Sequence, residues 1–196
     1  MDTMRLVFAS NNAHKLAEVR AIMPEDIEVL SLHDIGFESD IPETGTTLEE
    51  NSAIKARVVA DYISANGLAV DGIFADDTGL EIDALNGAPG VYTARWAGEP
   101  AANRKKALAE LTGQSNRAAQ FRTVITFIDR ENEMQVSGIV RGRIATEEYG
   151  DGGFGYDPLF IPEGYDKTFA ELPAEIKNSI SHRGRALAAL VKALQR

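Results

Sequence analysis

Short apolar runs alternate with longer amphipathic stretches along this chain. The runs 6–9 and 27–30 predict buried strands. The residues between them predict a helix that ends at about Met23, because Pro24 cannot continue it. A strand, a helix and a second strand therefore occupy the first thirty residues.

The longest predicted helix covers about residues 46–65. Thr46 and Thr47 are good N-caps, and each is followed three residues later by a glutamate, Glu49 or Glu50. The pair Asn66-Gly67 then predicts a left-handed cap at the other end.

The rest of the chain continues the alternation of strands and helices. The pattern predicts strands at 73–75, 80–83, 120–129, 134–144 and 159–161, a turn at 87–90, and helices at 101–111 and from Ser181 to the C-terminus. The link 129–133 predicts a hairpin between the two long strands. We therefore expect an α/β fold, a mixed sheet flanked by helices. No break in composition marks a boundary, so residues 1–196 are expected to form one domain with two lobes.

Composition excludes several classes of protein. The formal net charge is −10, which disfavours nucleic acid as a partner. The sequence has no run of about 18 apolar residues, so no membrane span is predicted. The first residues enter directly into a strand and lack the layout of a secretory signal. The chain has no cysteine, which excludes disulfides and thiolate zinc sites and fits a cytoplasmic location.

Two adjacent carboxylates, Asp76 and Asp77, precede Thr78-Gly79 at what is predicted to be the end of an apolar strand. Neighbouring side chains in an extended chain point to opposite sides, so only one carboxylate is expected to face a given cleft. Carboxylates at such a place could hold magnesium. The alternative is an Asx-turn that caps the strand.

A second candidate segment joins the first strand to the first helix. It consists of Ser10, Asn11, Asn12, Ala13, His14 and Lys15. The first amides of a helix attract anions, and the lysine adds a charge one turn into the helix. This is the arrangement of a phosphate cradle, although N-capping by an asparagine also explains it.

The segment 152–158 concentrates three glycines, two aromatic residues, a carboxylate and a proline. Glycine allows a ligand to approach the main chain, and the rings of Phe154 and Tyr156 offer faces for a flat ligand such as a nucleobase. The alternative is a tight turn with a core aromatic.

The last predicted helix begins with two cationic residues. His182 and Arg183 oppose the helix dipole there, which suggests a ligand, and Lys177 upstream could join them. The alternative is that both side chains point to solvent. Glu43 could supply a second acidic metal ligand and Lys55 could reach phosphates, although the local pattern predicts that both lie on the solvated surface.

Together these segments resemble the inosine triphosphate pyrophosphatase family. The resemblance covers nearly the whole chain, in order, through 10–15, 43–56, 75–80, 87–95, 152–158 and 181–184. It implies two lobes around a central substrate cleft, hydrolysis of ITP, dITP and XTP to the monophosphate and pyrophosphate, a requirement for Mg²⁺, and a homodimer. The first loop reads Ser-Asn-Asn where relatives often have Thr-Gly-Asn, and Pro42 stands where relatives often have an acidic residue.

The resemblance also implies roles for single residues. Asp77 would be the catalytic and metal-binding carboxylate, with Glu43 as the second metal ligand. Substrate would be bound by Ser10, Asn11, Asn12, Ala13, His14, Lys15, Thr78, Phe154, Gly155, Tyr156, Asp157, Lys177, His182 and Arg183. Two rival functions stay open: a related pyrophosphatase for modified pyrimidine triphosphates, and a nucleotide-binding sensor without catalytic activity.

Overall fold

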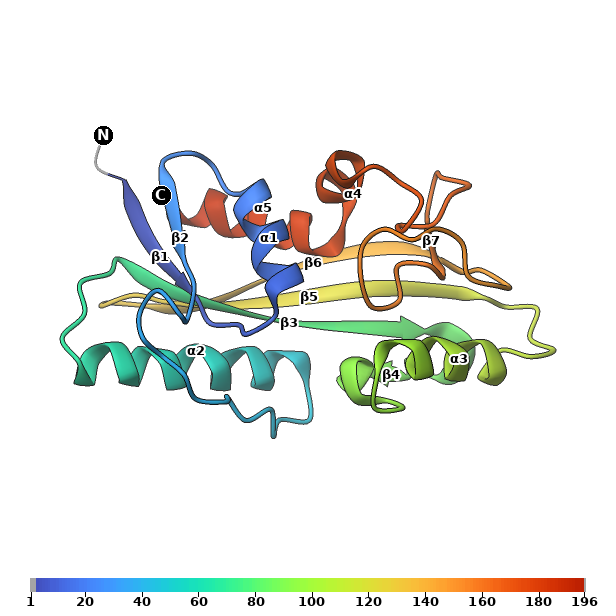
Figure 1. Cartoon of the computed structure of the whole chain (residues 1–196), viewed down its shortest axis with the longest axis horizontal. Coiled ribbons are helices and arrows are strands. Elements are labelled where there is room, and N and C mark those ends of the chain that lie inside the picture. The colour runs from blue at the N-terminus through green and yellow to red at the C-terminus, as the bar shows by residue number, and fades with distance from the viewer. Residues whose placement is uncertain (1–2, 196) are drawn as a thin grey trace. The chain divides into compact units, whose positions relative to one another are not determined.

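The computed structural model describes residues 3–195 (Figure 1). Its strands are β1 (Met4–Phe8), β2 (Ile27–Leu30), β3 (Gly72–Ile82), β4 (Pro89–Gly90), β5 (Ala118–Ile128), β6 (Glu133–Ile144) and β7 (Phe160–Pro162). Its helices are α1 (Ala13–Ile22), α2 (Leu48–Ala65), α3 (Pro100–Glu110), α4 (Ala174–Ile180) and α5 (His182–Leu194), with short 3-10 turns at Asp83–Leu85 and Thr93–Arg95. No helix within residues 3–195 is long and apolar enough to cross a bilayer.

The strands form one mixed sheet of seven strands. Their order is β2-β1-β3-β5-β6-β7, and β4 pairs with β3. β1 is parallel to β2 and β3, whereas β4 is antiparallel to β3 and β7 is antiparallel to β6. The mixed α/β fold that the sequence predicts is therefore confirmed.

The chain divides into two compact units. Unit 1 comprises the residues up to Asp77, Thr123–Gly138 and those from Arg183 onward, and unit 2 comprises Thr78–Arg122 and Ile139–His182. β3, β5 and β6 contribute residues to both. The single domain with two lobes stays a prediction.

In unit 1 the sheet is covered by helices on both faces. Side chains alternate along β1 and β3, so Phe8 and Phe74 lie on one face while Ala9 and Ala75 lie on the other. The first face packs against α1 and α5, and the second packs against α2 (Figure 1). Each face is thus closed by apolar packing.

Unit 2 has its own apolar core. Phe121, Phe160 and Phe169 form a ring cluster with centroid separations of 4.7–6.3 Å. Ala107 of α3 and Leu111 just after it pack against the same core. Tyr156 of the glycine-rich segment also belongs to it.

Helix boundaries follow the predicted signals. Thr47 caps α2 by accepting the Glu50 N–H at 3.1 Å, and Gly67 after the helix has φ +62°. The hairpin turn is held by Asp129 Oδ1, which accepts the N–H groups of Glu131 and Asn132 at 2.7 Å each. The last helix begins at His182 rather than Ser181, and residue 196 lies outside the described part.

One predicted boundary is wrong, and one short helix was not predicted. Asp76 and Asp77 do not end a strand, because β3 continues through them to Ile82, and most of the extended stretch predicted at 80–83 belongs to the same strand. The short helix α4 was not expected, although Lys177 lies on it.

Candidate active site

Asp76 and Asp77 lie inside β3 and point to opposite faces of the sheet, as neighbours in a strand must. Asp76 shares the face of Phe74 and meets cations from α1 and α5. Asp77 shares the face of Ala75 and meets Lys55 of α2. One strand therefore places two carboxylates in two separate environments, both within unit 1.

Asp76 is the centre of a buried ion network. Lys15 Nζ donates to Asp76 Oδ1 at 3.0 Å, and Arg183 Nε donates to Asp76 Oδ2 at 3.1 Å. Arg183 Nη1 donates in turn to Glu18 Oε2 at 2.5 Å. The Asp76 and Arg183 side chains are each 2 % exposed. The network thus alternates in sign across α1, β3 and α5.

The charges of this network determine the protonation state of Asp76. Burial by itself would raise the pKa of Asp76, but the charges of Lys15 and Arg183 prevail and hold this pKa far below its usual range. Burial lowers the pKa of Lys15, and the charge of Asp76 opposes it. Asp76 is therefore an anion at neutral pH that fixes Lys15 and Arg183 in place.

Asp77 has a different environment. Its Oδ1 lies 3.4 Å from Lys55 Nζ, which also donates to Glu43 Oε1 at 2.9 Å. Burial raises the pKa of Asp77, and the charge of Lys55 only partly opposes it. For Lys55, burial is outweighed by Asp77, Asp76 and Glu43, so the pKa of this ammonium is raised. A carboxylate whose affinity for a proton is increased is suited to accept one.

One oxygen of Asp77 has no partner. Asp77 Oδ2 is buried and accepts no hydrogen bond from any residue in the described part of the chain. Native structures rarely leave such an atom unsatisfied, and a bound ligand is a common reason when they do. This oxygen is the clearest sign of a reactive group in unit 1.

The expected phosphate cradle is a capped helix start that solvent can reach. Asn12 caps α1 and accepts the Lys15 N–H at 3.1 Å, while Ser10 Oγ accepts the Asn12 N–H at 3.1 Å. Asn11, Asn12, Ala13 and His14 are all exposed. The capping alternative is confirmed for Asn12, and the exposed helix start keeps the properties that attract an anion.

The glycine-rich segment and α4 form a second cluster, within unit 2. Asp157 Oδ2 accepts the Phe154 N–H at 3.0 Å and the Lys177 ammonium at 2.6 Å. The ammonium also lies 5.0 Å from the centroid of the Phe154 ring. Both members of the ion pair are 6 % exposed, so this is a buried, oriented cation beside an aromatic ring.

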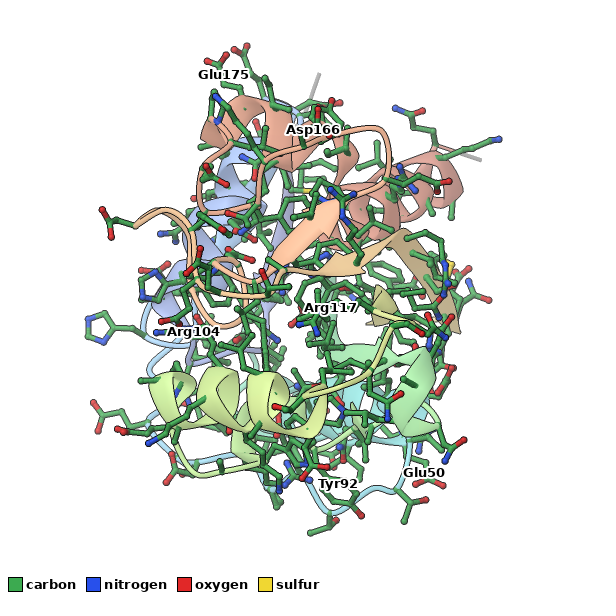
Figure 2. The ribbon with its side chains drawn as sticks, turned by 90° about the vertical axis from the view of Figure 1, so that its right-hand side faces the viewer. Glu50, Tyr92, Arg104, Arg117, Asp166 and Glu175 are labelled. Atoms are coloured by element: carbon green, nitrogen blue, oxygen red, sulfur yellow. The ribbon has the colours of Figure 1, made fainter. Side chains whose placement is uncertain are left out.

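Tyr156 and Gly155 are held by other parts of unit 2. The Tyr156 hydroxyl donates to the Thr93 carbonyl at 2.7 Å, and burial raises the pKa of this phenol. Arg104, which Figure 2 labels on α3, donates to the Gly155 carbonyl at 2.9 Å and pairs with Glu148. The structure gives Tyr156 a place in the core, and its predicted substrate contact stays a prediction.

The structure contradicts the solvent-facing alternative for His182 and Arg183 and the predicted surface position of Lys55. His182 is 4 % exposed and stacks on Phe121 with centroids 4.6 Å apart, and Arg183 is 2 % exposed. Lys55 is 6 % exposed rather than solvated. Carboxylates distant in sequence neutralise Arg183 and Lys55, so neither needs solvent. The Glu43 side chain, at 34 % exposed, is only partly accessible.

The predicted site residues fall into two groups. Ser10 to Lys15, Glu43, Asp77 and Arg183 belong to unit 1, and Thr78, Phe154 to Asp157, Lys177 and His182 belong to unit 2. The sequence did not assign a role to Asp76, Glu18 or Asn51. Asp76 and Glu18 belong to the ion network that includes Lys15, and Asn51 shares the buried face of α2 with Lys55. The sequence did contain a signal on α2, because the polar residues Asn51, Ser52 and Lys55 lie within the otherwise apolar buried face of this helix.

Gly153→Ala is expected to disturb the Asp157–Lys177 pair. Gly153 has φ +68°, and an added Cβ would collide with the Asp157 carboxylate. Gly155→Ala is the matched control, because Gly155 has φ +61° but open space around the added Cβ. We expect Gly155→Ala to cost about 1–2 kcal/mol for its backbone angle, and Gly153→Ala about 1–3 kcal/mol more for the collision. Denaturant unfolding measures both; equal losses would contradict the placement of Asp157.

Comparison with known proteins identifies the family of the chain. The profile of the Ham1 family matches residues 6–193. The chain belongs to the Ham1 family. A Flavobacterium johnsoniae protein named dITP/XTP pyrophosphatase is 51 % identical over 194 residues, which cover 97 % of this chain and 98 % of that protein. A protein of the same name from Christiangramia forsetii is 45 % identical over 98 % of this chain and 100 % of its own length.

Solved structures of Ham1 proteins share the fold. The Staphylococcus aureus Ham1 protein superposes with a TM-score of 0.84 at 39 % identity, covering 97 % of this chain and 98 % of that one. A Ham1 protein from Coxiella burnetii superposes with a TM-score of 0.86 at 38 % identity, covering 98 % of both chains. The mixed sheet with its flanking helices is therefore the Ham1 fold.

Proposed function

We propose that this Ham1 protein hydrolyses purine nucleoside triphosphates with non-standard bases (ITP, dITP and XTP) to the monophosphate and pyrophosphate. The names of its relatives at 45–51 % identity support this substrate class. The observation that carries the proposal is the Asp77 carboxylate, buried beside Lys55 with one oxygen unsatisfied, in a chain whose net charge is −10. An acidic protein can bind a polyanion only where cations are concentrated locally, and Lys15 and Lys55 flank this strand.

The reaction requires a water molecule to attack the α-phosphorus. A bond forms between the water oxygen and phosphorus, the bond to the β-phosphate oxygen breaks, and pyrophosphate leaves. Asp77 accepts the proton that the water loses, which its raised pKa favours. Lys15 and the exposed start of α1 offset the charge of the phosphate chain.

The residues present fit a divalent metal such as magnesium. Magnesium is usually held by one or two carboxylates together with water and substrate phosphates, rather than by a full protein cage. The Asp77 and Glu43 carboxylates both face the Lys55 ammonium, so two oxygen donors of the kind that magnesium prefers lie at one place. No group of three or more such ligands occurs among residues 3–195, which agrees with a site completed by substrate. When bound, the ion would stabilise negative charge on the phosphate oxygens.

Base selection is assigned to the cluster in unit 2. The Lys177 ammonium, oriented by Asp157 and lying beside the Phe154 ring, is the donor that we assign to the C6 oxygen of hypoxanthine or xanthine. Adenine presents an amino donor at C6, and two facing donors disfavour binding by about 1–3 kcal/mol. Guanine shares the C6 oxygen, so its rejection depends on a contact near C2.

A substrate panel tests this proposal. We expect pyrophosphate release from ITP, dITP and XTP, with magnesium present, to exceed that from ATP by about 5- to 150-fold in kcat/KM, the range that one unpaired polar group accounts for. The panel includes dUTP and methylated UTP, and pyrophosphate is measured with and without magnesium. Preference for a pyrimidine would favour the first rival function. Binding of ITP without release of pyrophosphate would favour the sensor.

The remaining expectations come from the resemblance alone. From the resemblance we propose that the chain forms a homodimer, that it is located in the cytoplasm and that it has a substrate cleft. Light scattering on the purified chain measures the oligomeric state.

A further inference from the structure

Asn51 lies on the face of α2 that packs against the sheet. It is fully buried, with 0 % exposure, and it precedes Lys55 by four residues, so the two share one side of the helix. Side chains on a helix lean toward its N-terminus, so the long Lys55 side chain extends back over the turn that holds Asn51. Because Lys55 Nζ reaches Asp77 Oδ1 at 3.4 Å, we infer from this helix geometry that Asn51 faces the same stretch of β3. Figure 1 shows α2 running along this part of β3.

The orientation of the Asn51 amide is determined by one hydrogen bond. The Gly45 N–H donates to Asn51 Oδ1 at 2.7 Å, and only the oxygen of the amide can accept it. The Nδ2 group therefore points away from Gly45. It is buried and has no hydrogen-bond partner among the residues that the structure describes.

Two complementary buried atoms, one on Asn51 and one on Asp77, are thus left unsatisfied. Asn51 Nδ2 is a donor and Asp77 Oδ2 is an acceptor, and both are shielded from solvent. A metal ion would satisfy only Asp77, and a phosphate oxygen would satisfy only Asn51. Water is the smallest group that accepts from one and donates to the other.

We propose that Asn51 is a further catalytic residue, which holds the attacking water against Asp77. The inference rests on the proposed hydrolysis. Asn51 Nδ2–H donates to the water oxygen, and the water donates a hydrogen to Asp77 Oδ2, the group that accepts its proton. One lone pair of the water then remains for the α-phosphorus. Asn51 Oδ1 meanwhile accepts the Gly45 N–H, and Gly45 is two residues from Glu43. The same side chain therefore contacts both the loop that carries Glu43 and the proposed water.

The test uses Asn51→Asp and Asn51→Ser in the full chain. Aspartate keeps an oxygen for the Gly45 N–H but loses the donor. Serine removes the Nδ2 donor without adding charge, because its own hydroxyl lies one bond short of the Nδ2 position. Asn66→Asp is the matched control, because it removes an amide donor and adds the same charge on the other end of α2, where Asn66 Nδ2 donates to the Tyr62 carbonyl in an exposed position. Measured quantities are kcat and KM for ITP, the melting temperature, and the affinity for inorganic pyrophosphate by calorimetry.

We expect kcat to fall about 100-fold in both Asn51 variants, as for loss of one preorganised donor. KM and the affinity for pyrophosphate should stay within about threefold of wild type, because a water contact contributes to the reaction step rather than to ground-state binding. Asn66→Asp should leave kcat unchanged.

Three results would overturn the inference while leaving the proposed function intact. The first is unchanged kcat in both Asn51 variants. The second is weaker pyrophosphate binding with kcat preserved, which would assign Asn51 to phosphate. The third is a lower melting temperature with kcat preserved, which would make Asn51 purely structural. A wild-type chain that releases no pyrophosphate from any nucleotide would overturn the proposed function and this inference together.

Discussion

Asp77→Asn is expected to abolish most pyrophosphate release from ITP and to leave the chain folded. Asparagine keeps the shape of the side chain but cannot accept a proton from water. Loss of a positioned base lowers kcat by about 100- to 10,000-fold. Lys55 retains its contact with Glu43 at 2.9 Å, so its buried charge keeps a carboxylate partner.

The stability of this variant follows from the sign of the pKa shift. The pKa of Asp77 is raised in the folded chain, so its charged form is disfavoured by folding at neutral pH. A neutral asparagine removes that unfavourable contribution, and we expect the melting temperature to stay the same or to rise. Turnover is measured by pyrophosphate detection and folding by thermal melting. Near wild-type turnover in a folded variant would refute the assignment of Asp77.

Asp76→Asn is expected to have the opposite effect: a large loss of stability. Asp76 is the shared partner of Lys15 and Arg183, and Arg183 is buried and always protonated. Removing the negative charge leaves both cations less compensated, although Arg183 keeps its pair with Glu18. Breaking a buried ion pair in this way destabilises by about 3–5 kcal/mol, which corresponds to a fall in melting temperature of roughly 10 °C for a chain of this size.

The pH dependence of this loss has a defined sign. The pKa of Asp76 is lowered on folding, so its contribution to stability is present above the unfolded pKa of about 4 and is lost as the pH falls through the folded value. The difference between wild type and Asp76→Asn should therefore be full at pH 7 and shrink in acid. Denaturant unfolding at several pH values measures it.

Asp83→Asn is the control for the charge change. Asp83 pairs with Arg141 through side chains that are 41 % and 44 % exposed, and such pairs contribute about 1 kcal/mol or less. A loss for Asp76→Asn no larger than that for Asp83→Asn would contradict the buried network.

The sequence by itself determined the elements whose signals are local. Thr47 and Gly67 mark the ends of α2, and Pro24 follows the end of α1, because caps and breakers act within one turn of the helix. The hairpin and the apolar strands follow from alternation along the chain. The ordered motifs also identified the family, since they preserve residue types that the site requires.

The tertiary structure alone decided how the charged residues are used. The sequence pattern predicted that a strand ends at Asp76 and Asp77, because charged residues are rare inside a buried strand. β3 continues through them because Lys15, Lys55 and Arg183 arrive from three different helices to compensate them. Arg183 lies 107 residues from Asp76 and 165 from Glu18 along the chain. The local pattern predicted a solvated surface for Lys55 and left solvent open as the alternative for Arg183, since a charge without a visible partner belongs in water. Electrostatic interaction depends on distance in space, and only the folded chain sets that distance.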